Sequence, residues 1–180
     1  MACAANGSWQ PRSPSTLRTF ISGEWRLVKT MNYARGGVTS TFSGSARFEP
    51  LNHGGHNLLQ YHEEGKVFIG SDSFAAHQRL LWDVGSEPPT VYFDEAQGER
   101  TPENIVTNAR FFHTIELNHL DGQPAPFEHH CDPDLYVGRL RFSTPDAFCI
   151  SWRITGPKKD GVIDNEFIRV PEADRGAAEL

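Results

Sequence analysis

The segment Phe20-Ile21-Ser22-Gly23-Glu24-Trp25 opens the patterned part of the chain, and Phe167-Ile168-Arg169 closes it. Between them, short runs of alternating apolar and polar residues are separated by Gly, Pro, Asn and Asp, and helical periodicity is scarce. This pattern predicts an all-β protein, a single antiparallel up-and-down β-barrel of about nine or ten strands. Small barrels of this kind enclose side chains or a ligand, so the inner face is where a pocket is expected.

The expected strands are separated by residues that favour chain reversal, among them Gly36-Gly37, Glu64-Gly65 and Lys159 to Gly161. Strands that are neighbours in sequence are therefore expected to be neighbours in the barrel. Some of the expected segments should fuse into longer strands. The segments are Trp25 to Tyr33, Val38 to Phe48, His56 to Glu63, Lys66 to Ser71, His77 to Val84, Thr90 to Asp94, Phe111 to Leu117, Glu128 to Cys131, Tyr136 to Phe142, Phe148 to Thr155 and Val162 to Val170.

A chain of 180 residues fits one domain with one core. Residues 1–18 and 171–180 are expected to be flexible tails on either side of a barrel domain of residues 19–170. A helical turn is expected at Thr101-Pro102-Glu103, where Thr could cap and Pro could take the first helical position. The link from Asp94 to Arg110 is expected to form a lid over one barrel mouth.

Charge and hydropathy exclude some classes of partner. The chain has 17 basic and 23 acidic residues and a net charge of −6, so it lacks the electrostatic footprint of a protein that binds nucleic acid or an anionic membrane. No apolar run approaches the ~18 residues of a membrane-spanning helix, and residues 1–23 lack the apolar core of a secretory signal. The expected partner is a neutral or cationic small molecule, or a protein, and the sequence is silent on oligomeric state.

The cysteines Cys3, Cys131 and Cys149 are odd in number and have no paired spacing. This argues for a reducing compartment and against an extracellular disulfide framework, so we expect a cytoplasmic protein. The first 23 residues contain Arg12 and Arg18 but no acidic residue, which makes an organelle matrix the alternative location.

Alternation assigns side chains to the two faces of each strand. Phe111, His113, Ile115 and Leu117 are expected to share one face, which places His113 on an apolar wall. Two other sets are expected to point inward: Phe148, Ile150, Trp152 and Ile154, and Tyr136, Leu140 and Phe142. The predicted pocket is thus walled by bulky rings with few polar atoms among them.

Several short sequence motifs follow one another in a recognisable order. They are Phe20-x-x-Gly23-x-Trp25, Arg79-x-x-Trp82, Phe112-His113, His129-x-Cys131-x-x-Asp134-x-Tyr136 and Trp152-x-x-x-Gly156-Pro157-x-Lys159. In this order the chain resembles an uncharacterised family, a domain of unknown function, with a lipocalin-like (calycin-like) barrel. The resemblance spans nearly all of residues 19–170. It implies the fold and a ligand pocket, and it brings no established activity, substrate or cofactor.

The opening Gly23-x-Trp25 is also similar to the start of the wider lipocalin group, in which the Trp closes the barrel base and an Arg of the last strand lies across its ring. The resemblance implies this structural role for Arg169, as a cation–π partner of Trp25. The chain departs from the group in having no secretory signal and no disulfide pair. An extracellular carrier of the usual lipocalin kind is therefore disfavoured.

The densest cluster of chemically active side chains is Glu128-His129-His130-Cys131-Asp132-Pro133-Asp134-x-Tyr136. In an extended strand His129 and Cys131 share one face while His130 and Asp132 share the other, so at most two can point into one cavity. A zinc site would need ligands from other strands, with His113 the first choice. The group lacks paired Cys-x-x-Cys or His-x-x-x-His spacing, and we predict no metal site and no cofactor. The alternative is that His129 and Tyr136 are hydrogen-bonded interior residues and Cys131 is a small buried one.

His113 is the candidate catalytic acid or base, because imidazole titrates near neutrality and an apolar wall favours its neutral form. A general base also needs an orienting partner, and Asp134, Tyr136 or Glu116 could serve. The alternative is a hydrogen-bonded core histidine with no catalytic role.

Arg79 and Trp82 would lie on opposite faces of a regular strand, although a bulge near Ala75-Ala76 would change this. An inward Arg79 would need a carboxylate, such as one from a ligand, whereas an outward Arg79 would be a surface cation. Lys158 and Lys159 lie in an expected hairpin, where they could hold a carboxylate or phosphate group or simply be solvated.

These features favour a non-enzymatic protein that binds a small apolar molecule with a polar head group. The predicted ligand-binding residues are Arg79, Trp82, His113, His129, Cys131, Tyr136, Trp152 and Lys159. The alternative is a cofactor-independent isomerase, cyclase or hydrolase that uses His113 with Tyr136 or Asp134 as its acid–base pair. A third hypothesis is a barrel that binds haem or a metal through His113 or His129.

Overall fold

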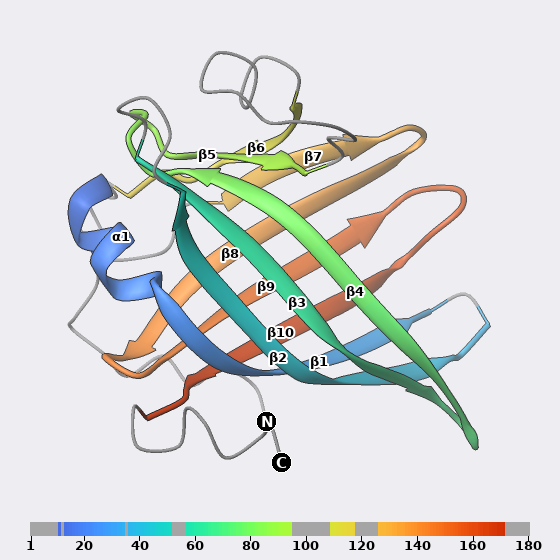
Figure 1. Cartoon of the computed structure of the whole chain (residues 1–180). Helices are drawn as coiled ribbons and strands as arrows, with labels where there is room; N and C mark the ends of the chain where they lie inside the picture. Colours follow the sequence, from blue (N-terminus) through green and yellow to red (C-terminus); the bar gives the residue numbers. More distant parts are fainter. Residues whose placement is uncertain are drawn as a thin grey trace.

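The described part of the chain folds into ten antiparallel strands and one short helix in the computed structural model (Figure 1). The structure describes residues 11, 13–34, 36–51, 57–94, 109–117 and 126–171. The strands form a single sheet that curls into a nearly closed barrel, so the predicted all-β up-and-down fold is confirmed. The elements are α1 (Pro14–Ile21), β1 (Gly23–Tyr33), β2 (Thr39–Leu51), β3 (Leu58–Ile69), β4 (Asp72–Asp83), β5 (Thr90–Phe93), β6 (Arg110–Thr114), β7 (Pro126–Cys131), β8 (Asp134–Thr144), β9 (Ala147–Thr155) and β10 (Gly161–Arg169).

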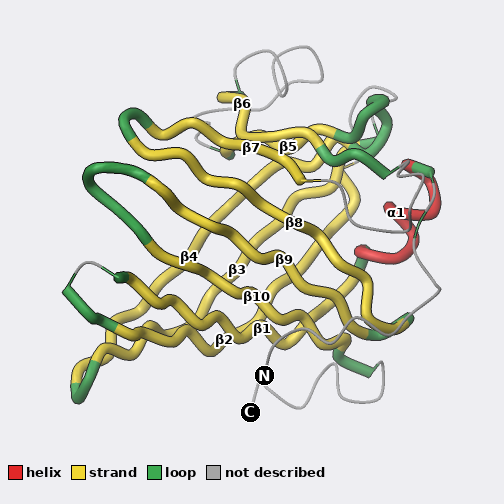
Figure 2. The backbone as a smooth tube through the Cα atoms, turned by 180° about the vertical axis from the view of Figure 1, so that it is seen from behind, coloured by secondary structure: helices red, strands yellow, loops and turns green. Residues whose placement is uncertain are grey.

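The first and last strands close most of the barrel. β1 pairs with β10 from Trp25 opposite Arg169 to Tyr33 opposite Gly161. The strand order is β6-β5-β4-β3-β2-β1-β10-β9-β8-β7, so all the other paired strands are neighbours in sequence. The two ends of the sheet, β6 and β7, lie side by side in both views of the backbone (Figures 1 and 2), and among the described residues no ladder of main-chain bonds joins them.

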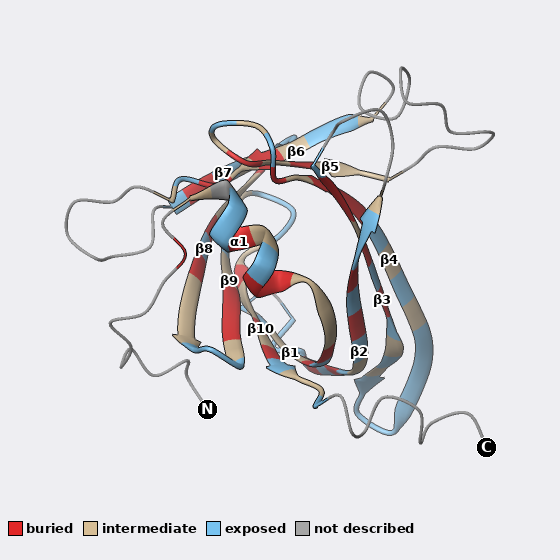
Figure 3. Ribbon diagram, turned by 60° about the vertical axis from the view of Figure 1, so that its left-hand side comes forward, coloured by how far each residue is buried: buried red, intermediate tan, exposed pale blue. Residues whose placement is uncertain are grey.

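The helix α1 lies across one end of the barrel (Figure 3). Ser13 caps its first turn: the Ser13 Oγ accepts from the backbone N–H of Thr16 at 3.3 Å, and the Ser13 N–H donates to the Thr16 Oγ1 at 3.0 Å. Leu17, Phe20 and Ile21 are buried against the strands. Residues 14–18 were expected to belong to a flexible tail, and they instead form most of this helix.

The predicted contact between Arg169 and Trp25 is present at the helical end of the barrel. The guanidinium carbon lies 4.2 Å from the centroid of the Trp25 ring. The same guanidinium donates to the backbone carbonyls of Ser22, at 3.0 Å, and Phe20, while the Trp25 Nε1 donates to the Ile21 carbonyl at 2.8 Å. Arg169 therefore ties the last strand to the segment that joins α1 to β1.

The strand β3 contradicts the turn expected at Glu64-Gly65. It continues through these residues to Ile69, and the reversal comes at Gly70, which has a φ of +59°. Gly65 faces Gly44 of β2 so closely that a Cβ on Gly65 would lie 2.4 Å from the Ser43 carbonyl oxygen. The glycine thus permits a close approach of two strand backbones, and the two segments expected on either side of it are one strand.

The expected face assignment in β6 is wrong at Phe111. The register between β5 and β6 shifts between Val91 and Tyr92, which pair with His113 and Phe111 respectively. This irregularity leaves Phe111 on the outside, with 53% of its surface exposed, and sends Phe112 toward the interior with His113. The inward placement of Phe148, Ile150, Trp152 and Ile154 in β9 is confirmed.

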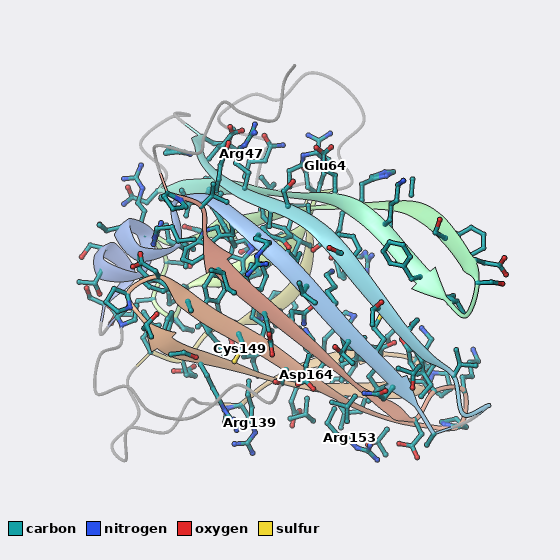
Figure 4. The ribbon with its side chains drawn as sticks, turned by 90° about the horizontal axis from the view of Figure 1, so that it is seen from below. Arg47, Glu64, Arg139, Cys149, Arg153 and Asp164 are labelled. Carbon is teal, nitrogen blue, oxygen red and sulfur yellow. The ribbon has the colours of Figure 1, made fainter. Side chains whose placement is uncertain are left out.

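The outer face of the barrel carries charged residues together with some exposed apolar ones, such as Phe74 and Phe111. Figure 4 shows Arg47, Glu64, Arg139 and Arg153 projecting away from the barrel interior.

Cys149 alternates with inward residues of β9 yet is completely buried, and it is disulfide-bonded. The expectation of no disulfide pair is therefore wrong, and the cysteines no longer argue for a reducing compartment.

Several expectations fall outside the described residues. They concern residues 1–10 and 172–180 of the two tails, the helical turn at Thr101-Pro102-Glu103, and most of the link from Asp94 to Arg110. In the described part of the chain, no helix is long and apolar enough to cross a bilayer.

Candidate ligand-binding site

The barrel encloses a cavity of about 330 Å³. Aromatic rings make up much of its lining, since nearly every strand contributes one inward-facing aromatic residue. These rings belong to Phe48, Tyr61, Trp82, Phe93, Phe112, Tyr136, Trp152 and Phe167. A cavity of this size and character is typical of small-molecule sites, in which ring faces bury the ligand and a few polar groups orient it.

The helical end of the barrel is filled by packed rings rather than by free space. Phe148 stacks on Phe167 with centroids 4.2 Å apart and an angle of 3° between the ring planes, and it meets Trp25 edge-on at 4.8 Å. Phe20 of α1 packs against Trp25 and Phe148. This cluster closes one end of the barrel beneath α1.

One wall of the cavity carries an ion pair between β1 and β3. The Lys29 Nζ lies 2.5 Å from the Glu63 Oε1, and the Glu63 Oε2 accepts a hydrogen bond from the Tyr61 hydroxyl. All three side chains line the cavity, and the exposed fractions of the Lys29 and Glu63 side chains are only 15% and 7%. Burial, followed by the neighbouring Glu63 carboxylate, raises the pKa of the Tyr61 phenol well above its usual value.

The opposite wall carries two neutral histidines. His113 Nδ1 lies 3.1 Å from the Thr114 carbonyl oxygen, and His129 Nδ1 lies 3.1 Å from the Phe112 carbonyl oxygen. Because a carbonyl only accepts, each ring carries its proton on Nδ1 and leaves Nε2 with a lone pair. Burial lowers the pKa of His113 to about 4, and burial likewise lowers the pKa of His129.

These two histidines also join β6 to β7, where the ladder is missing. His113 of β6 stacks on Phe127 of β7 at 4.2 Å with 14° between the planes, and His129 of β7 binds the Phe112 carbonyl of β6. We call this line between β6 and β7 the seam. It is held by side-chain contacts in the described residues, whereas every other boundary between neighbouring strands is a main-chain ladder.

Six of the eight predicted ligand-binding residues line this cavity. They are Trp82, His113, His129, Cys131, Tyr136 and Trp152. Their role in ligand binding stays a prediction. The expectation of a buried Cys131 is wrong, because this residue is exposed at the cavity's edge with a free thiol.

The other two predicted residues do not line the cavity. Arg79 points outward: its side chain is 47% exposed, and its Nε lies 3.3 Å from the Asp94 Oδ2. This is the surface-cation alternative, since regular alternation in β4 sends Trp82 inward and Arg79 outward. Lys159 is also exposed, and its Nζ donates to the Tyr136 hydroxyl at 3.1 Å, which raises the lysine's pKa.

Neither of the carboxylates predicted as a partner of His113 is hydrogen-bonded to its ring, whereas the third predicted partner, Tyr136, lines the same cavity and accepts from Lys159. The Asp134 Oδ1 accepts from the backbone N–H groups of Lys158 and Lys159, at 3.0 and 3.2 Å, so it holds the turn between β9 and β10. Glu116 is exposed, and the His113 Nδ1 is bonded to a backbone carbonyl instead of a carboxylate. Among the described residues, no group of three or more His, Cys, Asp or Glu side chains could hold a metal ion.

The polar wall of Lys29, Tyr61 and Glu63 was not predicted. The signal was present, because alternation in β1 puts Lys29 on the same face as the buried Trp25 and Leu27, and alternation in β3 puts Glu63 on the face of Tyr61. Charged residues are rarely buried unless they are paired, and a single strand does not reveal the partner. Asn165 and Gln78 complete the polar lining on this side.

The comparison with family models matches residues 21–169 to a family of unknown function, DUF6314. The chain belongs to this family. The match spans the barrel from the end of α1 to Arg169, and it confirms the resemblance to a domain of unknown function. The comparison with curated proteins gave no match.

Several solved structures are similar to this DUF6314 member. The S-type phycobiliprotein lyase CPES from Guillardia theta is 12% identical, with a TM-score of 0.58 over 89% of this chain and 94% of that chain. A protein of unknown function from the DUF3598 family of Nostoc punctiforme is 12% identical, with a TM-score of 0.46 over 85% of this chain and 49% of that chain. A de novo designed fluorescence-activating β-barrel is 14% identical, with a TM-score of 0.40 over 85% of this chain and 96% of that chain. At such identities the likeness to the lyase shows a common fold.

Proposed function

We propose that this protein binds a small, largely apolar molecule inside its barrel and does not transform it. The observation that carries the proposal is the cavity of about 330 Å³ walled by aromatic rings and interrupted by few polar groups. The lyase shares only the fold, so the proposal is based on the cavity rather than on that likeness.

The arrangement of polar groups supports binding over catalysis. The two histidines are oriented by backbone carbonyls, and their lowered pKa values keep them neutral at pH 7. No described carboxylate is hydrogen-bonded to either imidazole, so neither ring has an anionic partner that would stabilise the protonated form of a general base. Neutral rings and neutral imidazoles instead offer a surface suited to an uncharged aromatic guest.

A matched pair of variants on β10 tests the proposal. Ile163 lines the cavity, whereas Ile168 of the same strand is exposed on the outside. We expect the neutral fluorescent probe N-phenyl-1-naphthylamine to bind the natural protein with enhanced, blue-shifted emission. Ile163→Trp should abolish this signal by filling the cavity, and Ile168→Trp should leave it unchanged.

Native mass spectrometry of freshly purified protein would identify a molecule that is retained from the cell. If the probe bound equally well to the natural protein and to Ile163→Trp, the binding site would lie outside the cavity and the proposal would fail. The proposal would also be contradicted if the natural protein bound neither this probe nor any other apolar molecule.

A further inference from the structure

The wall formed by β1, β3 and β4 holds hydrogen-bond donors that the described residues leave unused. The Lys29 ammonium has three N–H groups and donates one of them to Glu63, whose other oxygen is taken by Tyr61. Trp82 is 97% buried and lines the same cavity, and its Nε1–H has no hydrogen-bond partner among the described residues. An indole N–H can only donate, so the group that satisfies it must be an acceptor.

The charges of this wall cancel. The positive charge of Lys29 is matched by the carboxylate of Glu63 at 2.5 Å, and the histidines opposite are neutral at pH 7. A carboxylate ligand at Lys29 would lie beside Glu63 without a second cation in the lining to offset it. A buried like-charge contact of this kind is unfavourable, so the free donors suit an uncharged acceptor.

We infer that the occupant of the cavity is a neutral aromatic molecule with a carbonyl oxygen, and that this oxygen accepts a hydrogen bond from the Lys29 Nζ. The inference rests on the proposed binding function and names its ligand class. Aromatic ketones, quinones and lactams fit this description, whereas fatty acids do not. The ion pair with Glu63 then serves to hold the ammonium at the wall, and the rings around it bury the rest of the guest.

Three probes with one ring system test the inference on the natural protein. They are 6-propionyl-2-(dimethylamino)naphthalene, which carries a ketone, 2-(dimethylamino)naphthalene, which carries no oxygen, and 6-(dimethylamino)-2-naphthoic acid, which carries a carboxylate. A hydrogen bond from a charged donor predicts a Kd for the ketone about tenfold lower than for the parent amine. The carboxylate should bind more weakly than the ketone at pH 7.

A variant that removes the whole cluster tests the role of Lys29. Lys29→Met, Tyr61→Phe and Glu63→Met together replace it with apolar groups of similar size and leave no buried charge unpaired. The ratio of the two Kd values, parent amine over ketone, should fall from about ten to about one. The matched control is Lys66→Met, an exposed lysine of β3 on the face opposite Glu63, and it should keep the natural ratio.

The outcomes separate the two proposals. If none of the three probes binds the natural protein, the proposed function fails and this inference fails with it. If ketone and parent amine bind equally, or if the carboxylate binds most tightly, only the inference is overturned. If Trp82→Phe removes the ketone's advantage while the triple variant keeps it, the donor is Trp82 and the assignment to Lys29 is wrong.

Discussion

His113 combines deep burial with a group that titrates in an accessible pH range. Its pKa is about 6.5 when unperturbed and about 4 in the fold, so the unfolded chain binds the proton more readily between these values. The contribution of His113 to the free energy of unfolding is therefore constant above about pH 6.5, and it falls as the pH drops toward 4. The loss from this residue is about 3 kcal/mol at full protonation.

Urea unfolding at a series of pH values measures this effect. We expect His113→Phe, which keeps a ring in the stack on Phe127, to lose less stability between pH 6.5 and pH 4.5 than the natural protein. His62→Gln is the matched control, because His62 is exposed on β3 and should leave the pH profile unchanged. Identical pH slopes for the natural protein and His113→Phe would contradict the burial of an uncharged imidazole.

The candidate pocket residues show what the sequence could predict at this scale. Alternation alone placed Tyr136 and Trp152 in the interior, because strand geometry fixes the side of each residue, but it left open which of Arg79 and Trp82 points inward. It did not identify Lys29 and Glu63. Burying either charge alone is unfavourable, and the partner that compensates it lies on a different strand, β3 for Lys29 and β1 for Glu63. Tertiary pairing of charges is not a local property of the sequence.

At the scale of elements, the close approach of β2 and β3 depends on Gly44 and Gly65. A Cβ at Gly65 would lie 2.7 Å from the Gly44 Cα as well as 2.4 Å from the Ser43 carbonyl oxygen. We expect Gly65→Val to destabilise the protein by about 3 kcal/mol through strand separation. Glu64→Val, on the exposed side of the same strand, should change stability by less than about 0.5 kcal/mol.

Denaturant midpoints for the two variants provide the measurement. A Gly65→Val variant as stable as Glu64→Val would show that the strands separate without penalty, and the close contact would then have no structural role. The comparison also separates a steric effect from the higher strand propensity of Val, which both variants share.

The elements that the sequence did not predict have local causes. Glycine favours both turns and close strand contacts, so Glu64-Gly65 was taken for a reversal although the strand continues. The helix α1 has only eight residues in a Ser- and Pro-rich stretch, and it is stabilised by packing Leu17 and Phe20 onto the barrel end. Phe111 was misplaced because a bulge in β6 breaks the alternation.

At the scale of the whole molecule, the seam predicts where the barrel opens first. Backbone amides protected by ladders on both sides exchange slowly with solvent, and those at an unpaired edge exchange faster. We expect hydrogen exchange in β6 and β7 to exceed that in β1, β2, β9 and β10, which are paired on both sides. Bound probe should slow exchange at the seam, since Phe112 and His129 line the cavity. Uniform protection across all strands would argue against this order of opening.

The contacts of two imidazoles at the seam have a consequence for how a guest reaches the interior. Because no main-chain bond crosses this line among the described residues, the wall can part there as a slit while every strand pair remains intact. A molecule wider than the barrel's end would then have a lateral route, and its passage would disturb two ring contacts rather than a ladder. Acid, by protonating those rings, would widen the same route.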